Sequence, residues 1–394
     1  MIGDIYLRKL VNCIRLILMI RRVVTAAVLI ISICMPSISL GAKFSYGVWV
    51  PYWKKAVAIP EVVQNVNSLK EISPFSYEVQ KSGIVRDAMR LTDVSWLTLM
   101  ETAYGSNIKI IPTFSWQNGD EIHAILSSST LRTAHIANIL RVVDANDFDG
   151  IDIDYENKKA ETSTYFSKFL TELSKAIHAK KKTLSCTIEA RTPPSSRFVT
   201  VPKVLEYAND FKVINTVCDE VRIMAYEQGR VDLKLNKTKS ASGNYYAPIS
   251  DSDWVEKVIL EALKTIKKEK IMLGVANFGS EYDVRLVNGV STYTDLRNLS
   301  YNEFQVLAST TASKVVRNNA GESGFIYTVN SISSTSTIIG TSTLTNATST
   351  RFVTLSDSKA IQAKITLAKK YKLKGVFLFK IDGESDPNLW SVLK

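Results

Sequence analysis

The sequence predicts a (β/α)₈ barrel, an α/β fold in which a closed parallel sheet is surrounded by helices. From about residue 44 onwards, short apolar segments alternate with amphipathic helical segments. Eight such strand–helix units in one chain indicate a parallel sheet that closes on itself. A second observation is the segment 148–156, where acidic side chains alternate along the fourth expected strand. In this fold the reacting groups lie at the carboxyl ends of the strands, which is where this segment ends.

The strands and helices follow from runs of β-branched and aromatic residues and from helical periodicity. The expected strands are Ser45–Trp53, Glu71–Val79, Lys109–Trp116, Gly150–Glu156, Thr183–Arg191, Glu220–Tyr226, Ile271–Phe278 and Gly375–Ile381. The expected helices include Thr92–Tyr104, Leu131–Ala145, Thr162–Ala179, Trp254–Lys267 and Ser358–Tyr371.

One interval, residues 280–355, departs from this alternation. It separates the seventh expected strand from the last long helix and contains several Ser/Thr tracts. Such tracts can be flexible linkers, but Phe325, Ile326 and Tyr327 provide apolar content for strands. We therefore expect a small β-rich insertion between the seventh strand and its helix, within a barrel domain of residues 43–394. No internal repeat and no appended binding module are recognisable.

Three acidic side chains are expected on one face of the fourth strand. Residues two apart in a strand share a face, so Asp152, Asp154 and Glu156 point the same way. Because three ionised carboxylates this close repel one another, one or more should remain protonated at neutral pH. A protonated acid beside an ionised one is the arrangement used to cleave glycosidic bonds.

Two other interpretations of the acidic segment are less consistent with its residues. A calcium loop has a glycine after its acidic triplet and irregular backbone, whereas here Gly150 precedes the triplet and strand-forming residues separate the acids. A solvated acidic face is opposed by Phe148, Ile151 and Ile153, which indicate a strand that is buried on both sides.

The segment Asp149–Glu156 matches the DGxDxDxE signature of glycoside hydrolase family eighteen, which includes chitinases, N-acetylglucosaminidases and spore-cortex-lytic peptidoglycan hydrolases. The resemblance implies a TIM barrel that needs no cofactor and no metal. It implies that Glu156 is the general acid and base and that the substrate's own acetamido oxygen is the nucleophile, an exception to the two-carboxylate scheme. Asp154 would then orient the acetamido group, Asp152 would share a proton with Asp154, and Tyr226 would hold the acetamido oxygen.

The residues by themselves leave a second route open. A retaining enzyme with two carboxylates needs a nucleophile about 5 Å from the acid. Glu189 is a candidate, because Ser185, Thr187 and Glu189 alternate on one face of the fifth expected strand. The sequence does not choose between Glu189 and the substrate's acetamido oxygen as nucleophile.

Further substrate contacts are expected at other strand ends. Met224 and Tyr226 share a face of the sixth strand and resemble the family's M-x-Y-D motif, in which Glu227 replaces aspartate. The alternative is that they form a core pair. Phe379 stands where the family commonly has a tryptophan under the sugar, and Trp53 and Trp116 are further candidates for stacking on sugars.

Two strands depart from the pattern of the better-known chitinases. The seventh resembles G-x-P-x-Y-G, but Ala276 replaces proline and Phe278 replaces tyrosine. The third, residues 111–116, lacks the S-x-G-G pattern and is closer to the spore-cortex and cell-wall branch. The missing S-x-G-G pattern favours peptidoglycan over chitin. The replacements at Phe278, Phe379 and Glu227 keep open a sugar-binding protein without catalysis.

The N-terminus has the layout of an export signal. Five basic residues lie among the first 22 positions, and an apolar run from Val23 to Cys34 and a small-residue stretch follow. We expect residues 1–42 to be a signal peptide, with Met19 as a possible true start. An uncleaved membrane anchor is the alternative, although the apolar run is short for a membrane span.

Charge and cysteine content limit the possible partners. The chain carries +11, and removal of residues 1–42 leaves 44 basic against 37 acidic residues, or +7. This excess suits an anionic polymer such as a cell wall, and no nucleic-acid signature is present. Cys186 and Cys218 could pair or remain buried thiols, and no cysteine–histidine spacing suggests a metal site.

Together these observations predict a secreted or cell-envelope glycosidase that is a monomer. It would cleave β-1,4 bonds after N-acetylglucosamine in peptidoglycan or chitin, and the membrane would be involved only through the export signal. The alternative is a catalytically weak or inactive lectin that binds the same polymers on the same barrel.

Overall fold

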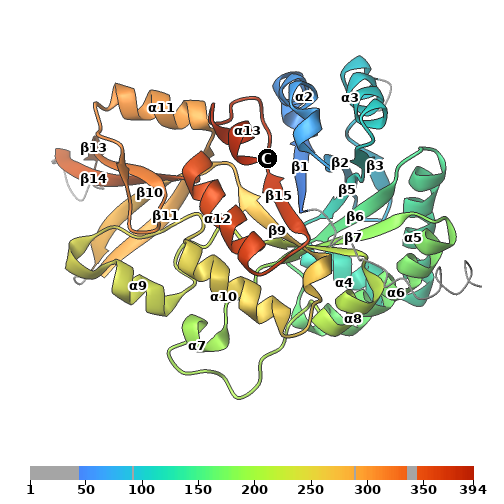
Figure 1. Ribbon diagram of the computed structural model, residues 1–394. Helices are drawn as coiled ribbons and strands as arrows, with labels where there is room; N and C mark the ends of the chain where they lie inside the picture. Colours follow the sequence, from blue (N-terminus) through green and yellow to red (C-terminus); the bar gives the residue numbers. More distant parts are fainter. Residues whose placement is uncertain (1–43, 91–92, 288–289, 335–343) are drawn as a thin grey trace, which may run out of the picture. The chain divides into compact units, whose positions relative to one another are not determined.

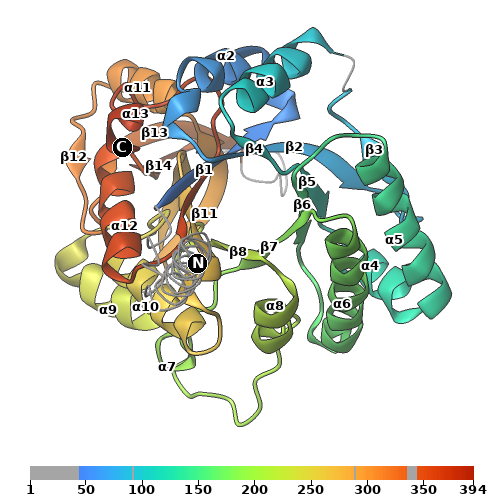
Figure 2. The ribbon, with the colours of Figure 1, turned by 45° about the vertical axis from the view of Figure 1, so that its right-hand side comes forward.

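A closed barrel of eight parallel strands forms the centre of the unit Phe44–Lys394 (Figures 1 and 2). The computed structural model describes residues 44–90, 93–287, 290–334 and 344–394, so the expected export segment lies outside the described residues. The first strand pairs in parallel with both the second and the last, which closes the ring. The predicted (β/α)₈ barrel is confirmed.

The eight barrel strands occur where the sequence places them, although several end one or two residues earlier. They are β1 (Ser45–Pro51), β2 (Glu71–Val79), β4 and β5 together (Lys109–Ile110 and Thr113–Trp116), β6 (Gly150–Tyr155), β7 (Thr183–Glu189), β8 (Glu220–Met224), β9 (Ile271–Ala276) and β15 (Gly375–Phe379). The third strand is split at Pro112, which has no N–H to donate to the sheet. A short strand, β3 (Val85–Asp87), pairs antiparallel with β2 at the edge.

Helices surround the strands, as Figure 2 shows. The longer ones are α2 (Lys55–Gln64), α3 (Val94–Gly105), α4 (Gly119–Ser127), α5 (Ser129–Asp144), α6 (Ser163–Ala179), α10 (Ser252–Leu263) and α12 (Ser358–Lys370). The shorter ones are α7 (Pro194–Arg197), α8 (Phe211–Val217), α9 (Leu233–Lys239) and α13 (Leu389–Val392). Within the described ranges, no helix combines the length and the apolar character needed to cross a membrane.

Strand β6 is buried on both faces. Ile151 and Ile153 are fully buried in the main hydrophobic core, which also contains Phe166 and Phe169 of α6. The alternation therefore turns Asp152 and Asp154 to the opposite face, into the barrel. A Cβ atom on Gly150 would lie 2.2 Å from the carbonyl oxygen of Thr183, so only glycine fits at the start of this strand.

The barrel interior combines an apolar cluster with a buried ionic network. Trp49, Met272 and Phe377 form the apolar cluster. Beside it lies Arg222, fully buried, with its guanidinium group 3.8 Å from the ring centre of Phe377. Because a buried cation requires compensating charge, its partners are important for the site described below.

The insertion between β9 and α12 is β-rich, as the sequence predicts. It forms a five-stranded antiparallel sheet with one helix, α11, that was not expected. Its elements are β10 (Gly279–Val287), β11 (Val290–Leu299), α11 (Tyr301–Thr310), β12 (Val316–Arg317), β13 (Ser323–Ser334) and β14 (Leu344–Leu355). The strand order is β11-β10-β14-β13-β12 (Figure 1). Because β10 begins three residues after β9 ends, this sheet adjoins the carboxyl ends of the barrel strands.

Cys186 and Cys218 form a disulfide, with Cα atoms 6.1 Å apart. Of the two alternatives that the sequence leaves open, the structure contains the pair. Cys186 lies on the outer face of β7 and Cys218 directly follows α8, so the bond joins the barrel wall to the chain that leads into β8.

Candidate active site

Asp152 is fully buried in the barrel, where two threonine hydroxyl groups and one guanidinium group surround its carboxylate. Its carboxylate accepts hydrogen bonds from Thr113 at 2.9 Å and from Thr187 at 2.9 and 3.0 Å. Arg222 lies 3.1 Å from Oδ2 of Asp152, and both side chains are fully buried. The charge of Asp152 is therefore balanced by a cation below the site.

Arg222 is held by three strands at once. It donates to Glu220 at 2.9 Å and to Ser73 at 2.8 Å, and it forms an ion pair with Glu71. Burial raises the pKa of Glu71 to about 8, with Glu220 adding to the effect, whereas Arg222 and Lys374 hold the pKa of Glu220 below its ordinary value despite burial. The sequence analysis did not assign Arg222 a role, although its period-two spacing from Met224 and Tyr226 places it on the inner face.

Asp154 is 3% exposed, and its Oδ1 atom is buried without a hydrogen-bond partner among the described residues. Burial raises the pKa of Asp154 well above its ordinary value, and the charges of Glu156 and Asp152 raise it further. Burial and the neighbouring acids therefore favour the protonated form of this group. Proton sharing between Asp154 and Asp152, which the family resemblance implies, stays a prediction.

Glu156 follows the last residue of β6 and is partly exposed. Its amide donates to the carbonyl oxygen of Trp116 at 2.8 Å, which continues the sheet pairing by one residue. Its carboxyl group accepts from Gln117 Nε2 at 3.2 Å. Burial raises the pKa of Glu156, followed by the charge of Glu189, while the hydrogen bond from Gln117 opposes the rise. These are the properties of a proton donor that solvent and substrate can reach.

Glu189 faces the same region from β7. It accepts from Asn209 Nδ2 at 2.5 Å and lies 3.6 Å from the ammonium group of Lys158. The structure thus brings the predicted second carboxylate close enough to Glu156 to influence its pKa. However, each carboxylate oxygen of Glu189 has a protein partner.

Lys158 is a residue that the sequence analysis missed. Its side chain is fully buried, donates to the carbonyl oxygen of Tyr155, and lies 4.7 Å from the ring centre of Phe166. Burial lowers its pKa, while Glu189, Asp154 and Glu156 raise it. Asn157 adopts a left-handed conformation (φ 57°) that turns the chain back after Glu156. In the sequence, only Asn157, a residue that tolerates the left-handed conformation, hints that the Lys158 side chain is buried.

An aromatic wall adjoins the acids. The ring of Tyr226 stacks on Phe379 with centroids 5.6 Å apart and meets Phe278 edge-on at 6.0 Å. Among the described residues the Tyr226 hydroxyl makes no hydrogen bond. Burial raises its pKa well above the ordinary value, and the nearby Asp154 and Glu156 add to this. Met224 packs against the same cluster.

Two predicted contacts lie at the edges of this wall. Trp53 is 49% exposed on a short 3₁₀ turn, and its ring meets Phe75 at 5.6 Å. Glu227 is exposed and has φ 55°. Partial burial of its carboxyl group raises its pKa, and the charge of Asp295 of the insertion raises it further. The structure therefore brings both near the barrel mouth.

Trp116 is not at the site, contrary to the expectation from the sequence. Its ring is 3% exposed and packs edge-on against Tyr155 at 5.5 Å, and its indole N–H faces Glu121 of α4 at 3.3 Å. Thr113 and Ser115 occupy the inward positions of β5, opposite Asp152 and Asp154 of β6, so the next residue points outward into the helix layer.

A barrel whose fourth strand ends in a partly exposed acid beside a second, buried acid, both with raised pKa, defines the class of barrel glycosidases. Within the described residues, no group of side chains could hold a metal ion. The sequence model of glycosyl hydrolases family 18 matches residues 71–384. The chain therefore belongs to this family of glycoside hydrolases.

Relatives agree with this assignment. An uncharacterised glycosylase, YvbX, of Bacillus subtilis is 20% identical over 280 residues, covering 70% of each chain. The cortical fragment-lytic enzyme of the same bacterium is 23% identical over 82% of this chain and 67% of its own. Among solved structures, the Bacillus cereus spore cortex-lytic enzyme SleL superimposes with a TM-score of 0.66 at 20% identity, covering 89% and 73% of the two chains. A chitinase from Chromobacterium violaceum gives 0.65 at 18% identity, covering 89% and 98%.

Proposed function

We propose that the chain cleaves the β-1,4 bond after N-acetylglucosamine in peptidoglycan, by a mechanism in which the substrate's acetamido group is the nucleophile. The observation that carries the proposal is the buried, unpartnered Oδ1 of Asp154 near Glu156, whose pKa is raised by burial. A buried oxygen without a partner is costly, and the N–H of an acetamido group could satisfy it.

The reaction would proceed in two steps. Glu156 donates its proton to the glycosidic oxygen while the bond from that oxygen to C1 breaks. The acetamido carbonyl oxygen then bonds to C1 and forms a cyclic oxazolinium ion. In the second step Glu156 takes a proton from water, the water oxygen bonds to C1, and the bond to the acetamido oxygen breaks. Two displacements at C1 retain its configuration.

Other side chains would hold the acetamido group during this reaction. The hydroxyl of Tyr226 is free to donate to the acetamido oxygen, and Asp154 would accept from the nitrogen. Glu189 is bound to Asn209 and Lys158, which favours the substrate-assisted route over Glu189 as nucleophile. Phe379 and Trp53 would stack on the apolar faces of sugars, as aromatic side chains do in carbohydrate sites.

Peptidoglycan is favoured over chitin by two considerations. Two of the relatives have names that describe lysis of spore cortex or its fragments. The basic charge after loss of residues 1–42, +7, suits an anionic polymer. We also propose export through the N-terminal segment, which the Cys186–Cys218 disulfide supports, because disulfides persist mainly in oxidising compartments.

The test is hydrolysis of 4-methylumbelliferyl chitobioside and of purified peptidoglycan by the full chain, by Glu156→Gln, and by Glu161→Gln. Glu161 is an exposed glutamate five residues further on and is a matched control. Loss of the acid should lower kcat by about 10²–10⁴-fold, whereas the control should match the parent. Peptidoglycan that has been N-deacetylated should resist cleavage, because it has no acetamido oxygen.

Three outcomes would contradict parts of this proposal. Cleavage of deacetylated glycan would refute substrate assistance, and preferred cleavage of chitin would refute the substrate assignment. Binding of both polymers without turnover would identify a lectin.

A further inference from the structure

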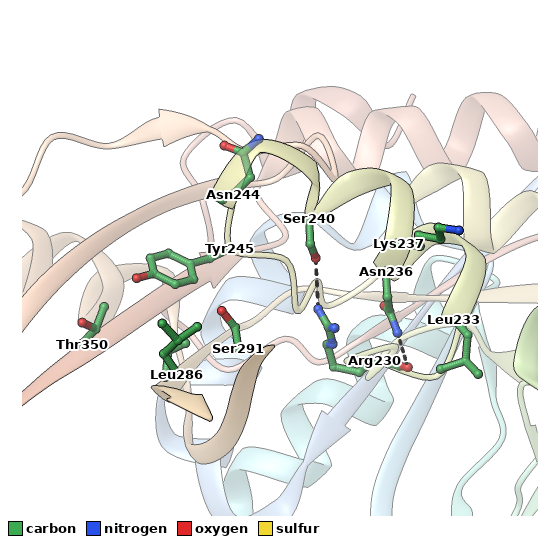
Figure 3. A pocket seen from close by; sticks show the side chains of 12 residues that line it. Arg230, Leu233, Asn236, Lys237, Ser240, Asn244, Tyr245, Leu286, Ser291 and Thr350 are labelled. Carbon is green, nitrogen blue, oxygen red and sulfur yellow. Dashed lines mark hydrogen bonds between the residues drawn. The ribbon is translucent and has the colours of Figure 1, made fainter. Parts of the chain in front are cut away.

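A cavity of about 670 Å³ lies between α9 and the insertion sheet, separate from the acids of the barrel (Figure 3). Its walls come from Arg230, α9 and the segment after it on one side, and from β10, β11 and β14 on the other. None of the family's expected substrate contacts lines it. The question is which ligand its side chains suit.

The cavity lies on the same face of the insertion sheet as the residues that adjoin the site. Tyr282, Val284 and Leu286 alternate along β10, so they share one face, and the last two line the cavity. Across the sheet, Asp295 is opposite Tyr282 and Ser291 is opposite Leu286. Asp295 is the residue whose charge reaches Glu227 at the barrel mouth. Four residues of strand span about 13 Å, so along β10 the cavity lies about that far from the level of Asp295.

The charge of the cavity is positive. Arg230 and Lys237 line it, and none of the other lining residues is acidic. Arg230 donates to Ser240 Oγ at 3.1 Å and to the carbonyl oxygen of Tyr246 at 2.9 Å, both of which are neutral. In the described structure neither cation forms an ion pair. An anionic group in the cavity would therefore meet two cations whose charges are not yet compensated.

A buried acceptor that lacks a partner in the described structure belongs to Asn236, one of the residues that line the cavity. Asn236 is 6% exposed, and its Nδ2 donates to the carbonyl oxygen of Arg230 at 2.6 Å. Its Oδ1 is buried and has no partner among the described residues. Figure 3 shows Asn236 beside Arg230 and Ser240, with Tyr245 and Leu286 on the other side of the cavity. A ligand with both an amide N–H and a carboxylate would complete these contacts.

We propose that this cavity binds the carboxylate-bearing, peptide-substituted sugar of a peptidoglycan strand, several units from the bond that is cleaved. The proposal rests on the proposed function, since it names a distal subsite for the same polymer. Arg230 and Lys237 bind the carboxylate, Asn236 accepts an amide N–H, and the ring of Tyr245 packs against the sugar or peptide.

The test compares Lys237→Glu with Lys234→Glu. Lys234 is an exposed lysine of the same helix that does not line the cavity, so the charge change is matched. Both are made in the full chain in a Glu156→Gln background, so that the ligand is not consumed. Binding is measured by calorimetry with peptide-substituted glycan fragments and with neutral chito-oligosaccharides of equal length.

Lys237→Glu should weaken binding of the peptide-substituted fragment by about tenfold or more, the usual effect of losing one charge-assisted contact. Binding of the neutral oligosaccharide should be unchanged, and Lys234→Glu should resemble the parent for both. The difference should diminish as salt is raised, because exposed charges are screened. Equal effects of the two substitutions, or equal losses for both ligands, would overturn the proposal.

The design separates this proposal from the proposed function. If the cavity binds the fragment through Lys237 but the parent chain, with Glu156 intact, hydrolyses nothing, the catalytic proposal fails and the subsite remains. If the parent chain hydrolyses peptidoglycan while Lys237→Glu has no effect on binding, the subsite fails and the catalytic proposal remains.

Discussion

Breaking the Cys186–Cys218 disulfide should measurably destabilise the barrel without abolishing its fold. Both cysteines are buried, at 1% and 0% exposure, and the bond closes a loop with a sequence separation of 32 residues. That loop contains the second half of β7 together with α7 and α8, and it leads into β8, which carries Arg222 and ends two residues before Tyr226. In the unfolded chain, the bond limits how far these segments can separate.

The magnitude follows from the size of the loop. A cross-link that closes about 33 residues removes unfolded-state entropy worth about 4 kcal/mol at 25 °C in the chain-entropy description. The unit Phe44–Lys394 has roughly 350 residues, and unfolding entropy is about 2.1 cal/mol/K per residue near the melting temperature. The melting temperature should therefore fall by about 5 °C when the bond is reduced.

The assay is thermal unfolding of the full chain with and without dithiothreitol, with the state of the two cysteines established by non-reducing peptide mapping. The control is the double variant Cys186→Ala/Cys218→Ala, whose melting temperature should not respond to the reductant. The reasoning is refuted if mapping shows the bond intact before reduction and broken afterwards while the melting temperature stays constant. Free thiols in protein isolated from its native compartment would instead argue against the pairing and against export.

Three further substitutions test the electrostatics of the barrel. Lys158→Met removes a cation that lowers the pKa of Glu156. Because the protonated acid is the active form, the alkaline limb of the kcat/KM pH profile should move to higher pH. The control Lys159→Met, at an exposed lysine, should leave the profile unchanged. Burial raises the pKa of Glu71 to about 8, above the unfolded-state value of 4.5. The native state therefore loses stability as pH rises from about 4.5 to 8. At 1.36 kcal/mol per pKa unit the loss is up to about 5 kcal/mol. Urea unfolding of Glu71→Gln should lack this loss. Parallel pH dependence for Glu71→Gln and the parent would contradict the raised pKa of Glu71. Glu220→Gln should be less stable than the parent at pH 7, because the native state lowers the pKa of Glu220. The stability gained in this way is present above the unfolded-state pKa and is lost as pH falls through the native-state pKa.

The fold could be predicted from the sequence because its determinants are local. Each barrel strand is a short β-branched run followed by helical periodicity, and the acids of β6 alternate with Ile151 and Ile153, whose burial fixes which face points inward. The disagreement about Trp116 has a different origin. Thr113 and Ser115 alternate with Phe114 and Trp116, so the sequence places Trp116 on the face opposite the two hydroxyl groups. Because both faces of β5 are buried, only the register with β6 shows that the hydroxyl face is the one that points into the barrel.

The compensating cations could not be predicted because their contacts are distant in sequence or depend on a single turn. Arg222 reaches Glu71, which is 151 residues away, and Ser73, which is 149 residues away. Lys158 points inward only because Asn157 accepts a left-handed conformation. The acidic signature thus identifies the reacting groups, but the residues that set their charges are found only in three dimensions.

These cations explain how one strand can carry three acids. Arg222 balances Asp152 from below, and Lys158 forms an ion pair with Glu189 at the side. Asp154 and Glu156 have no comparable ion pair in the described structure, and burial raises the pKa of both. Glu156, the proton donor of the proposed reaction, and Asp154, its acceptor for the acetamido N–H, are therefore the carboxyl groups for which the described barrel provides no direct cation. The chemistry follows from where the positive charges are placed as much as from the acids themselves.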